Sequence, residues 1–346
     1  MPKLWIDNQE VEVPDGATIL EAAEKLGIDI PTLCHMKGLE PNTSCFVCVV
    51  KVDGGDDLVP SCATAAREGM RVESETDEVR SARRTAIELL LSDHVGDCVA
   101  PCQMADAQHA NIPRMIRQIA AGDPAAAAAT IRASRALSDL DGARAEKACR
   151  RARHDQAVAI DLLMKYAAAA AGPPGDDLPP CEESKPRFSV HMGKLSEGEM
   201  EQFLAGASRD PRVEPADPDA GFTDDEARRE AARCLHCDCR KADNCRLRDC
   251  AEAYGAKAAH FRGPRRDFVQ IREHPDVIYE PGKCIACGLC IQIARNAGEE
   301  PGLSFVGRGF DVRVAVPFER PMSEALRKVA AECVAACPTG ALAMRD

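Results

Sequence analysis

Four cysteines near the N-terminus have the residue type and spacing needed to hold iron. Their gaps are 10, 2 and 13 residues, and they are Cys34, Cys45, Cys48 and Cys62. The central CxxC pair can bring two thiolates onto one iron from a tight loop, with the other two cysteines entering from either side. Four thiolates suit a [2Fe–2S] centre, in which each iron takes two soft ligands. A zinc ribbon is the alternative, although zinc ribbons usually pair two short CxxC knuckles.

A second set of cysteines lies in the last quarter of the chain. Cys284, Cys287 and Cys290 are separated by two residues each, and Cys337 follows much later, next to a proline. This pattern resembles bacterial ferredoxins, in which the last cysteine of each run ligates the cluster of the other run. The resemblance implies one [4Fe–4S] cluster on these four cysteines. The other cluster of such a ferredoxin is expected to be missing, because its ligand positions are occupied by Ala294, Arg327, Ala330 and a single remaining cysteine, Cys333.

A third set of cysteines falls within 17 residues, at Cys234, Cys237, Cys239, Cys245 and Cys250. We expect the first four to hold a [4Fe–4S] cluster, because Cys250 lies in a helical stretch. Zinc stays open as an alternative here, since gaps of two and five residues also suit a tetrahedral thiolate site. Basic residues near Cys239 and Cys245, and Lys283 beside Cys284, are expected to raise cluster potentials by stabilising the more negative reduced form.

The elements around the first cysteine set can be predicted from short patterns. Residues 4–6 and 11–13 suit two strands joined by a polar turn over residues 7–10. A helix then begins at Thr18, with Glu21 completing a capping box, and ends at Gly27. This order of hairpin, helix and cysteine loop resembles a β-grasp ferredoxin. It is closer to the N-terminal domain of the large iron–sulfur subunit of complex I and of NAD-linked hydrogenases.

Residues 79–91 form an amphipathic pattern that predicts a helix leading to His94, Cys98 and Cys102. A histidine followed by cysteines resembles the His/Cys-ligated [4Fe–4S] motif that comes after the [2Fe–2S] domain of complex I. An exposed histidine at a helix end is the alternative reading of His94.

Beyond Cys102 the sequence resembles the helical iron–sulfur domain of the glutamate synthase small subunit and of dihydropyrimidine dehydrogenase. Three family cysteines are replaced here, by Asp106, Asp141 and Ala145, while Cys98, Cys102 and Cys149 remain. The resemblance implies that one complete ligand set is lost. It also implies one [4Fe–4S] cluster held by His94, Cys98, Cys102 and Cys149. A helical domain without any cluster is the alternative.

These patterns predict an α+β multidomain protein. We expect a β-grasp [2Fe–2S] ferredoxin domain over residues 1–78 and a helical iron–sulfur domain over 79–166. A linker and connecting segment follows over 167–222, in which Cys181 is expected to have no role. A cysteine-rich [4Fe–4S] segment over 223–260 and a bacterial ferredoxin-like [4Fe–4S] domain over 261–346 complete the chain.

Composition limits the function further. The chain has 346 residues with 44 basic and 56 acidic side chains, a net charge of −12 that argues against nucleic acid as a partner. No apolar run is long enough to insert into a membrane and no signal-peptide pattern is present, so we expect a cytoplasmic protein. In that compartment 18 cysteines are expected to bind metal rather than to form disulfides.

The sequence therefore predicts an iron–sulfur electron-transfer subunit of a soluble multi-subunit oxidoreductase. We expect one [2Fe–2S] cluster, two to three [4Fe–4S] clusters and no catalytic residue. No FAD or NAD site is expected, because GxGxxG and P-loop motifs are absent. Its partners would be an NAD(P)H dehydrogenase-like or glutamate synthase-like flavoprotein and a hydrogenase, formate dehydrogenase or ferredoxin. A cluster-carrying redox sensor and a structural zinc scaffold are the alternatives.

Overall fold

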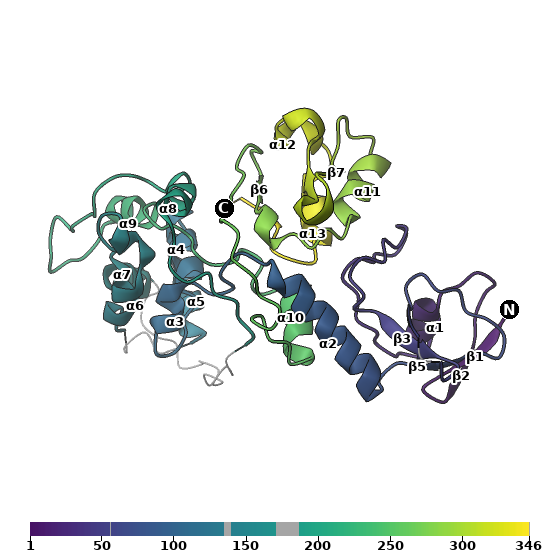
Figure 1. Ribbon diagram of the computed structural model, residues 1–346. Coiled ribbons are helices and arrows are strands. Elements are labelled where there is room, and N and C mark those ends of the chain that lie inside the picture. The colour runs from purple at the N-terminus through teal and green to yellow at the C-terminus, as the bar shows by residue number, and fades with distance from the viewer. Residues whose placement is uncertain (56, 135–139, 171–186, 346) are drawn as a thin grey trace. The chain divides into compact units, whose positions relative to one another are not determined.

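The computed structural model describes residues 1–55, 57–134, 140–170 and 187–345, and for Phe310 the backbone alone. Two compact units are present (Figure 1), one formed by Met1–Val95 with Arg240–Arg345 and the other by Gly96–Cys239. The predicted cysteine-rich segment 223–260 is thus divided between the units. Cys181 and the first part of the predicted linker lie outside the described residues.

A five-stranded mixed sheet forms the N-terminal part of the first unit. Its strand order is β2-β1-β5-β3-β4, with β1 and β5 parallel and the other neighbours antiparallel. The strands are β1 Lys3–Ile6, β2 Gln9–Glu12, β3 Val49–Val52, β4 Leu58–Pro60 and β5 Arg71–Glu73. The helix α1, Ile19–Lys25, packs its buried Ile19, Ala22 and Ala23 into the same core as Leu4 and Ile6. This mixed α+β arrangement was predicted.

Two local predictions in this part can be compared directly with the structure. The capping box of α1 is confirmed, since Thr18 accepts from the Glu21 amide while the Glu21 carboxylate accepts from the Thr18 amide. The polar turn is shorter than predicted, because Ile6 already pairs with Gln9. Asp7 and Asn8 have φ of 46° and 66°. Two successive residues with positive φ make the tight hairpin turn that Asp and Asn tolerate.

Helices α2, Asp77–Ser92, and α10, Arg246–Ala253, also belong to the first unit and pack against each other. The predicted amphipathic pattern of α2 is confirmed by buried Val79, Ile87 and Leu91. The same buried face contains Arg83, which donates from Nε and Nη2 to the carbonyl of Val49, at 3.2 and 2.9 Å. This helix therefore contacts the strand that directly follows Cys48.

The C-terminal part of the first unit contains two small sheets, in which β6 Val277–Tyr279 pairs with β9 Leu342–Met344 and β7 Ser304–Val306 pairs with β8 Arg313–Ala315. The second pair is a hairpin in a segment, residues 304–318, whose alternating apolar residues rich in Val and Phe suit strands. Its helices are η2 Pro281–Lys283, α11 Leu289–Asn296, η3 Gly309–Asp311, η4 Pro317–Glu319, α12 Met322–Ala325 and α13 Ala330–Ala336. An aliphatic core joins β6, β9, α11 and α13.

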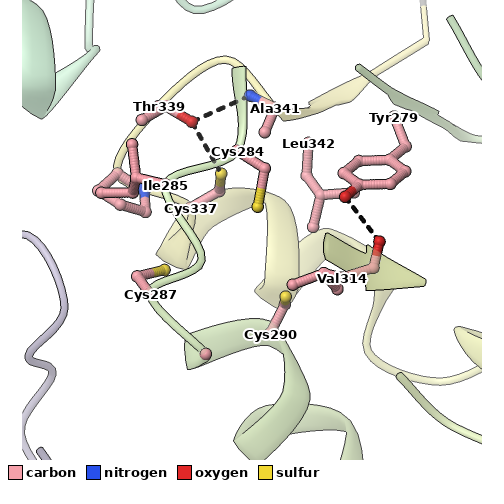
Figure 2. A pocket seen from close by; sticks show the side chains of 12 residues that line it. Tyr279, Cys284, Ile285, Cys287, Cys290, Val314, Cys337, Thr339, Ala341 and Leu342 are labelled. Atoms are coloured by element: carbon pink, nitrogen blue, oxygen red, sulfur yellow. Dashed lines mark hydrogen bonds between the residues drawn. The ribbon is translucent and has the colours of Figure 1, made fainter. Parts of the chain in front are cut away.

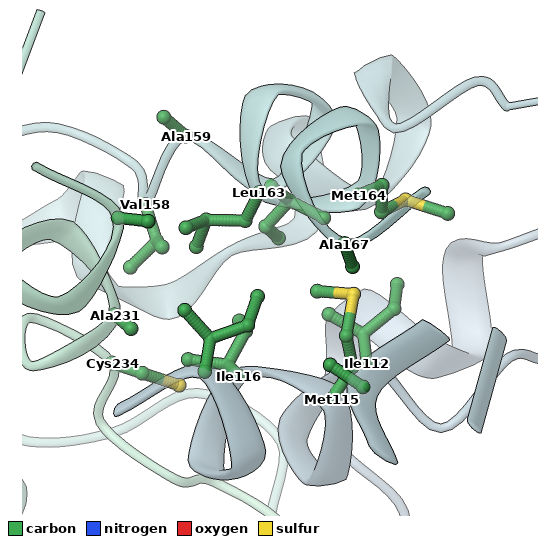
Figure 3. Close-up of a cluster of buried hydrophobic side chains, with 14 of the residues drawn as sticks. Ile112, Met115, Ile116, Val158, Ala159, Leu163, Met164, Ala167, Ala231 and Cys234 are labelled. Atoms are coloured by element: carbon green, nitrogen blue, oxygen red, sulfur yellow. The ribbon is translucent and has the colours of Figure 1, made fainter. Parts of the chain in front are cut away.

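The second unit is helical as far as it is described. Its helices are α3 Pro101–Ala105, α4 Ile112–Ala120, α5 Pro124–Arg132, α6 Ala143–Ala148, η1 Arg150–Arg153, α7 Ile160–Ala170, α8 Glu197–Leu204 and α9 Asp224–Ala231. Figure 3 shows side chains of α4, α7 and α9 meeting in one buried cluster that reaches Cys234. Residues 197–204, within the predicted linker and connecting segment, form α8, which begins with a capping box of Ser196 and Glu199 and buries Phe203 and Leu204. Within the described part of the chain, every helix is too short or too polar to span a bilayer.

Candidate metal centres

The four N-terminal cysteines lie together and are all buried. Cys34 approaches Cys45 with 3.3 Å between their sulfur atoms, and Cys48 approaches Cys62 at 3.4 Å. These close pairs differ from the predicted one, which placed Cys45 and Cys48 on one iron. The reason is the loop geometry, since Phe46 has φ of 53° and turns the chain sharply between the two cysteines.

The two sulfur atoms of each close pair are hydrogen-bonded to each other. The hydrogen bond with Cys45 is the main cause that lowers the pKa of Cys34 to about 5. The hydrogen bond with Cys62 likewise lowers the pKa of Cys48 to about 7. The pKa of Cys45 and that of Cys62 are raised by the same hydrogen bonds. One cysteine of each pair is therefore favoured as the thiolate, which is the form that ligates iron.

A second group of cysteines lines a cavity of about 360 Å³ in the C-terminal part of the first unit. The cavity is formed by α11, β6, β8 and the loop after α13, and its cysteines are Cys284, Cys287, Cys290 and Cys337. Figure 2 shows all four sulfur atoms pointing into the space between these segments. The structure thus brings together the four residues that the ferredoxin pattern grouped. Cys333 is fully buried in the neighbouring core and is not among the residues that line the cavity.

Polar groups surround this cavity. The Tyr279 hydroxyl donates to the carbonyl of Val314 at 2.7 Å, and the side chain lines the cavity together with Cys284. Burial raises the pKa of Tyr279, so the hydroxyl keeps its proton. The hydroxyl of Thr339 lies 3.7 Å from the sulfur of Cys337. The Ala286 amide donates to the sulfur of Cys284 at 3.4 Å, and a hydrogen bond of this kind to thiolate sulfur stabilises the reduced form of a cluster.

Lys283, the residue expected to raise the potential here, is buried and forms an ion pair with Glu280, which is also buried. Glu280 in turn accepts a hydrogen bond of 2.6 Å from Gln270. Because the ammonium charge has a partner, its effect on a cluster bound at this cavity is that of a dipole rather than of a full positive charge.

The middle cysteines are arranged differently from the prediction. In the second unit, a cavity of about 340 Å³ is lined by Cys102, Cys149, Cys234 and Cys237. The predicted sets had placed the first two with His94 and Cys98, and the last two with Cys239 and Cys245. The structure groups these cysteines differently because α3, the end of α6 and the loop after α9 all line the same pocket.

The remaining members of the predicted sets occupy other places. Cys98 and Cys239 share a backbone hydrogen bond of 3.4 Å in the second unit, and the Val190 amide donates to the Cys98 sulfur. Cys245 belongs to the first unit, where its sulfur approaches the carbonyl of Pro338 at 3.9 Å. Cys250 lies within α10, as predicted, and burial raises its pKa to about 11.

His94 also belongs to the first unit, just after α2. Burial, with a smaller effect from Lys283, lowers the pKa of His94 to about 3. Its Nδ1 is buried and has no hydrogen-bond partner among the described residues. His94 is therefore a neutral imidazole at physiological pH, which is the form that ligates metal.

These arrangements also bear on zinc. Among the described residues, no three His, Cys, Asp or Glu side chains are grouped so that they could hold a single metal ion. A structural zinc ion needs four ligands at about 2.0–2.3 Å from one point. A cluster of several irons spreads its thiolates more widely, so the cysteine-lined cavities fit a cluster better than a mononuclear ion.

Comparisons with known proteins give a consistent result for the N-terminal part. Residues 3–77 match the family described as a 2Fe-2S iron-sulfur cluster binding domain. The chain is 49% identical over 104 residues to the NADP-reducing hydrogenase subunit HndD of Solidesulfovibrio fructosivorans, covering 29% of this chain and 18% of that protein. It is 45% identical over 98 residues to a subunit of an NADH-quinone oxidoreductase of Rhizobium meliloti, covering 28% and 12%. The chain thus spans less than a fifth of the length of these relatives.

A solved structure extends the likeness beyond the N-terminal part. A chain in the crystal structure of an NAD+-reducing [NiFe]-hydrogenase in the H2-reduced state matches with a TM-score of 0.54 and 18% identity, covering 99% of this chain and 87% of that one. At 18% identity, this match shows that the two chains have a similar fold. The N-terminal region of this chain therefore matches a 2Fe-2S cluster binding domain and is similar to part of a subunit of an NADP-reducing hydrogenase and of an NADH-quinone oxidoreductase.

Proposed function

We propose that this chain is an iron–sulfur electron-transfer subunit of a multi-subunit oxidoreductase. It would relay single electrons between an NAD(P)H-linked flavoprotein and another redox module. The observation that carries the proposal is the presence of separate groups of four cysteines, which we call nests. The first nest lies in a segment that matches a [2Fe–2S] domain. Iron–sulfur clusters supply one-electron chemistry when bound, and the protein tunes them.

The cysteines of these groups are of the residue type that binds iron–sulfur clusters, because iron is ligated by thiolate sulfur. Cys34 and Cys45 would hold one iron of a [2Fe–2S] cluster, and Cys48 and Cys62 the other, as their close sulfur pairs suggest. A [4Fe–4S] cluster would occupy the cavity that includes Cys284. One or two further [4Fe–4S] clusters would bring the total to the expected two or three. The chain would contribute thiolates, hydrogen bonds and a dry environment rather than a substrate-converting group.

Contacts within the first unit support a relay between the first two sites. The side chains of Asn42 and Ser44 approach the carbonyl of Ala286, at 3.4 and 3.5 Å. Gln292 makes two hydrogen bonds to the backbone of Glu40, of 3.0 and 2.8 Å. Ser44 directly precedes Cys45 and Ala286 directly precedes Cys287, so the contact between Ser44 and Ala286 joins the neighbours of two candidate ligands. Short paths of this kind favour electron transfer because its rate falls steeply with distance.

The partners are inferred from the similar proteins. Names that include NADP-reducing hydrogenase and NADH-quinone oxidoreductase suggest a flavoprotein with an NAD(P)H dehydrogenase function as one partner. A hydrogenase, formate dehydrogenase or ferredoxin would be the other. The resemblance of residues 79–166 to glutamate synthase, and with it a glutamate synthase-like partner, stays a prediction from sequence.

The proposal can be tested with the anaerobically purified chain. Iron and acid-labile sulfide would be counted, and EPR spectra would be recorded during stepwise reduction. NADH alone is expected to leave the protein oxidised, whereas NADH with catalytic amounts of a flavoprotein NADH dehydrogenase is expected to reduce it. Cys34→Ser should remove the [2Fe–2S] signal, while Cys250→Ser should retain it. A colourless protein containing zinc would overturn the proposal, as would reduction by NADH without the flavoprotein.

A further inference from the structure

The cavity in the second unit combines cysteines from segments that are far apart in the sequence. Cys102 lies in α3, Cys149 directly follows α6, and Cys234 and Cys237 follow α9. All four line one pocket, as the four cysteines of the ferredoxin-like cavity in the first unit do. The other lining residues are largely apolar and include Pro113, Ile116, Val158 and Ile160. Four soft ligands around a dry space match what a [4Fe–4S] cluster requires.

The CxxC loop of this cavity has the same local geometry as the one in the first unit. In both loops the residue before the second cysteine has positive φ, 48° for His236 and 51° for Ala286. In both, the amide of that residue donates to the sulfur of the first cysteine at 3.4 Å. Positive φ is uncommon for residues other than glycine. Its recurrence with the same N–H···S bond indicates a loop shaped to stabilise a metal-bound thiolate.

Buried arginines hold the ligand segments together. Arg151, two residues after Cys149, has no exposed side chain and donates to the carbonyl of Arg233 at 2.7 Å. Arg233 directly precedes Cys234 and is itself fully buried, with its guanidinium paired to Glu230. The ligands from two distant segments are therefore fixed relative to each other by the protein. Such support is what keeps a metal site in its productive geometry.

A second ion pair fixes the other side of the cavity. Arg117 of α4 binds Asp238 through two hydrogen bonds of 2.9 and 2.8 Å, and Asp238 directly follows Cys237. Arg150, directly after Cys149, pairs with the buried Asp97 and donates to the carbonyl of Gly193 at 3.1 Å. The segments that carry Cys149 and Cys237 are therefore held in place by ion pairs of the protein.

We infer that Cys102, Cys149, Cys234 and Cys237 together ligate one [4Fe–4S] cluster. This site combines residues that the sequence patterns assign to two different clusters. The inference rests on the proposed function for the iron–sulfur chemistry, and it adds which residues share a cluster. It leaves the clusters at the other two nests unaffected.

A pair of single variants and their double variant distinguish the two groupings. If Cys149 and Cys234 share a cluster, Cys149→Ser and Cys234→Ser should each lose the same EPR signal and about four irons per chain. The double variant should then lose about four irons as well. Two different signals, with about eight irons lost in the double variant, would overturn the inference. Cys98→Ser serves as the matched control and should retain this signal.

A second measurement uses the wild-type protein, so that the inference can still be tested if the variants fail to fold. The holoprotein would be treated anaerobically with a slow iron chelator, and iodoacetamide labelling of each cysteine would be followed by mass spectrometry. The four proposed ligands should become labelled with one common time course, matching the loss of one EPR signal. Separate time courses for Cys149 and Cys234 would contradict the inference. Absence of all cluster signals before treatment would instead contradict the proposed function.

Discussion

Replacing Arg151 with alanine should destabilise the second unit strongly. The guanidinium is fully buried and donates to the carbonyls of Ser208, at 2.6 Å, and of Arg233, at 2.7 Å, while also pairing with Asp155. A hydrogen bond that involves a charged group contributes about 1.5–3 kcal/mol. Removing one partner from a buried ion pair costs about 3–5 kcal/mol in measured cases. We therefore expect the free energy of opening of this unit to fall by about 3–5 kcal/mol.

Hydrogen exchange followed by mass spectrometry can measure this loss within the unit itself. Each 1.4 kcal/mol corresponds to a factor of ten, so slow amides of α7 should exchange roughly two to three and a half orders of magnitude faster in Arg151→Ala. Arg153→Ala is the matched control, since Arg153 is an exposed neighbour in the same short helix. It should change the free energy by no more than about 0.5 kcal/mol. Equal exchange rates in the two variants would refute the reasoning.

Three further predictions concern single side chains. Gln292→Ala should slow electron exchange between the [2Fe–2S] and ferredoxin-like sites in rapid-mixing EPR without removing either signal, because both hydrogen bonds to Glu40 are lost. Tyr279→Phe should change the reduction potential of the cluster at Cys284 little in a redox titration, since the hydroxyl donates to the carbonyl of Val314 rather than to a cluster ligand. The hydrogen bond with Arg151 lowers the pKa of Asp155 in the folded protein. The Asp155 carboxylate therefore stabilises the fold at pH values above the ordinary pKa of an aspartate, about 3.9, and this stabilisation is lost as the pH falls below that value. The thermal midpoints of wild type and Asp155→Asn should therefore differ at pH 6 and converge towards pH 2.5.

The parts of the sites that could be predicted depend on short-range geometry. Cys284, Cys287 and Cys290 lie on one loop and the first turn of α11, and the ferredoxin pattern supplies the position of Cys337. The capping box at Thr18 is equally local, and so is the hairpin of β7 and β8. The capping box and the hairpin are set by residues that are neighbours along the chain. The ferredoxin motif includes one distant cysteine, Cys337, but the motif itself says which cysteine that is.

The parts that the patterns missed depend on packing between distant segments. No spacing relates Cys149 to Cys234, and their approach follows from the burial of α4, α7 and α9 in one core. The sulfur pairing of Cys34 with Cys45 likewise follows from a loop conformation rather than from the CxxC motif. The helix α8 is a different case, because Ser196 and Glu199 form a capping box that is visible in the sequence.

The two [4Fe–4S] nests differ in how cluster binding would relate to folding. At both, a CxxC loop can form locally, but the nest in the second unit needs Cys102 and Cys149 from separate segments that are aligned by buried arginine bonds. Those bonds join protein groups only, so the alignment of these two segments does not depend on the thiolates alone. In the first unit Cys337 reaches its loop through α13 and through Thr339, which donates to the carbonyl of Lys283 at 2.8 Å. Since both nests are supported by bonds beyond the thiolates, losing one ligand should remove a cluster before it unfolds the unit.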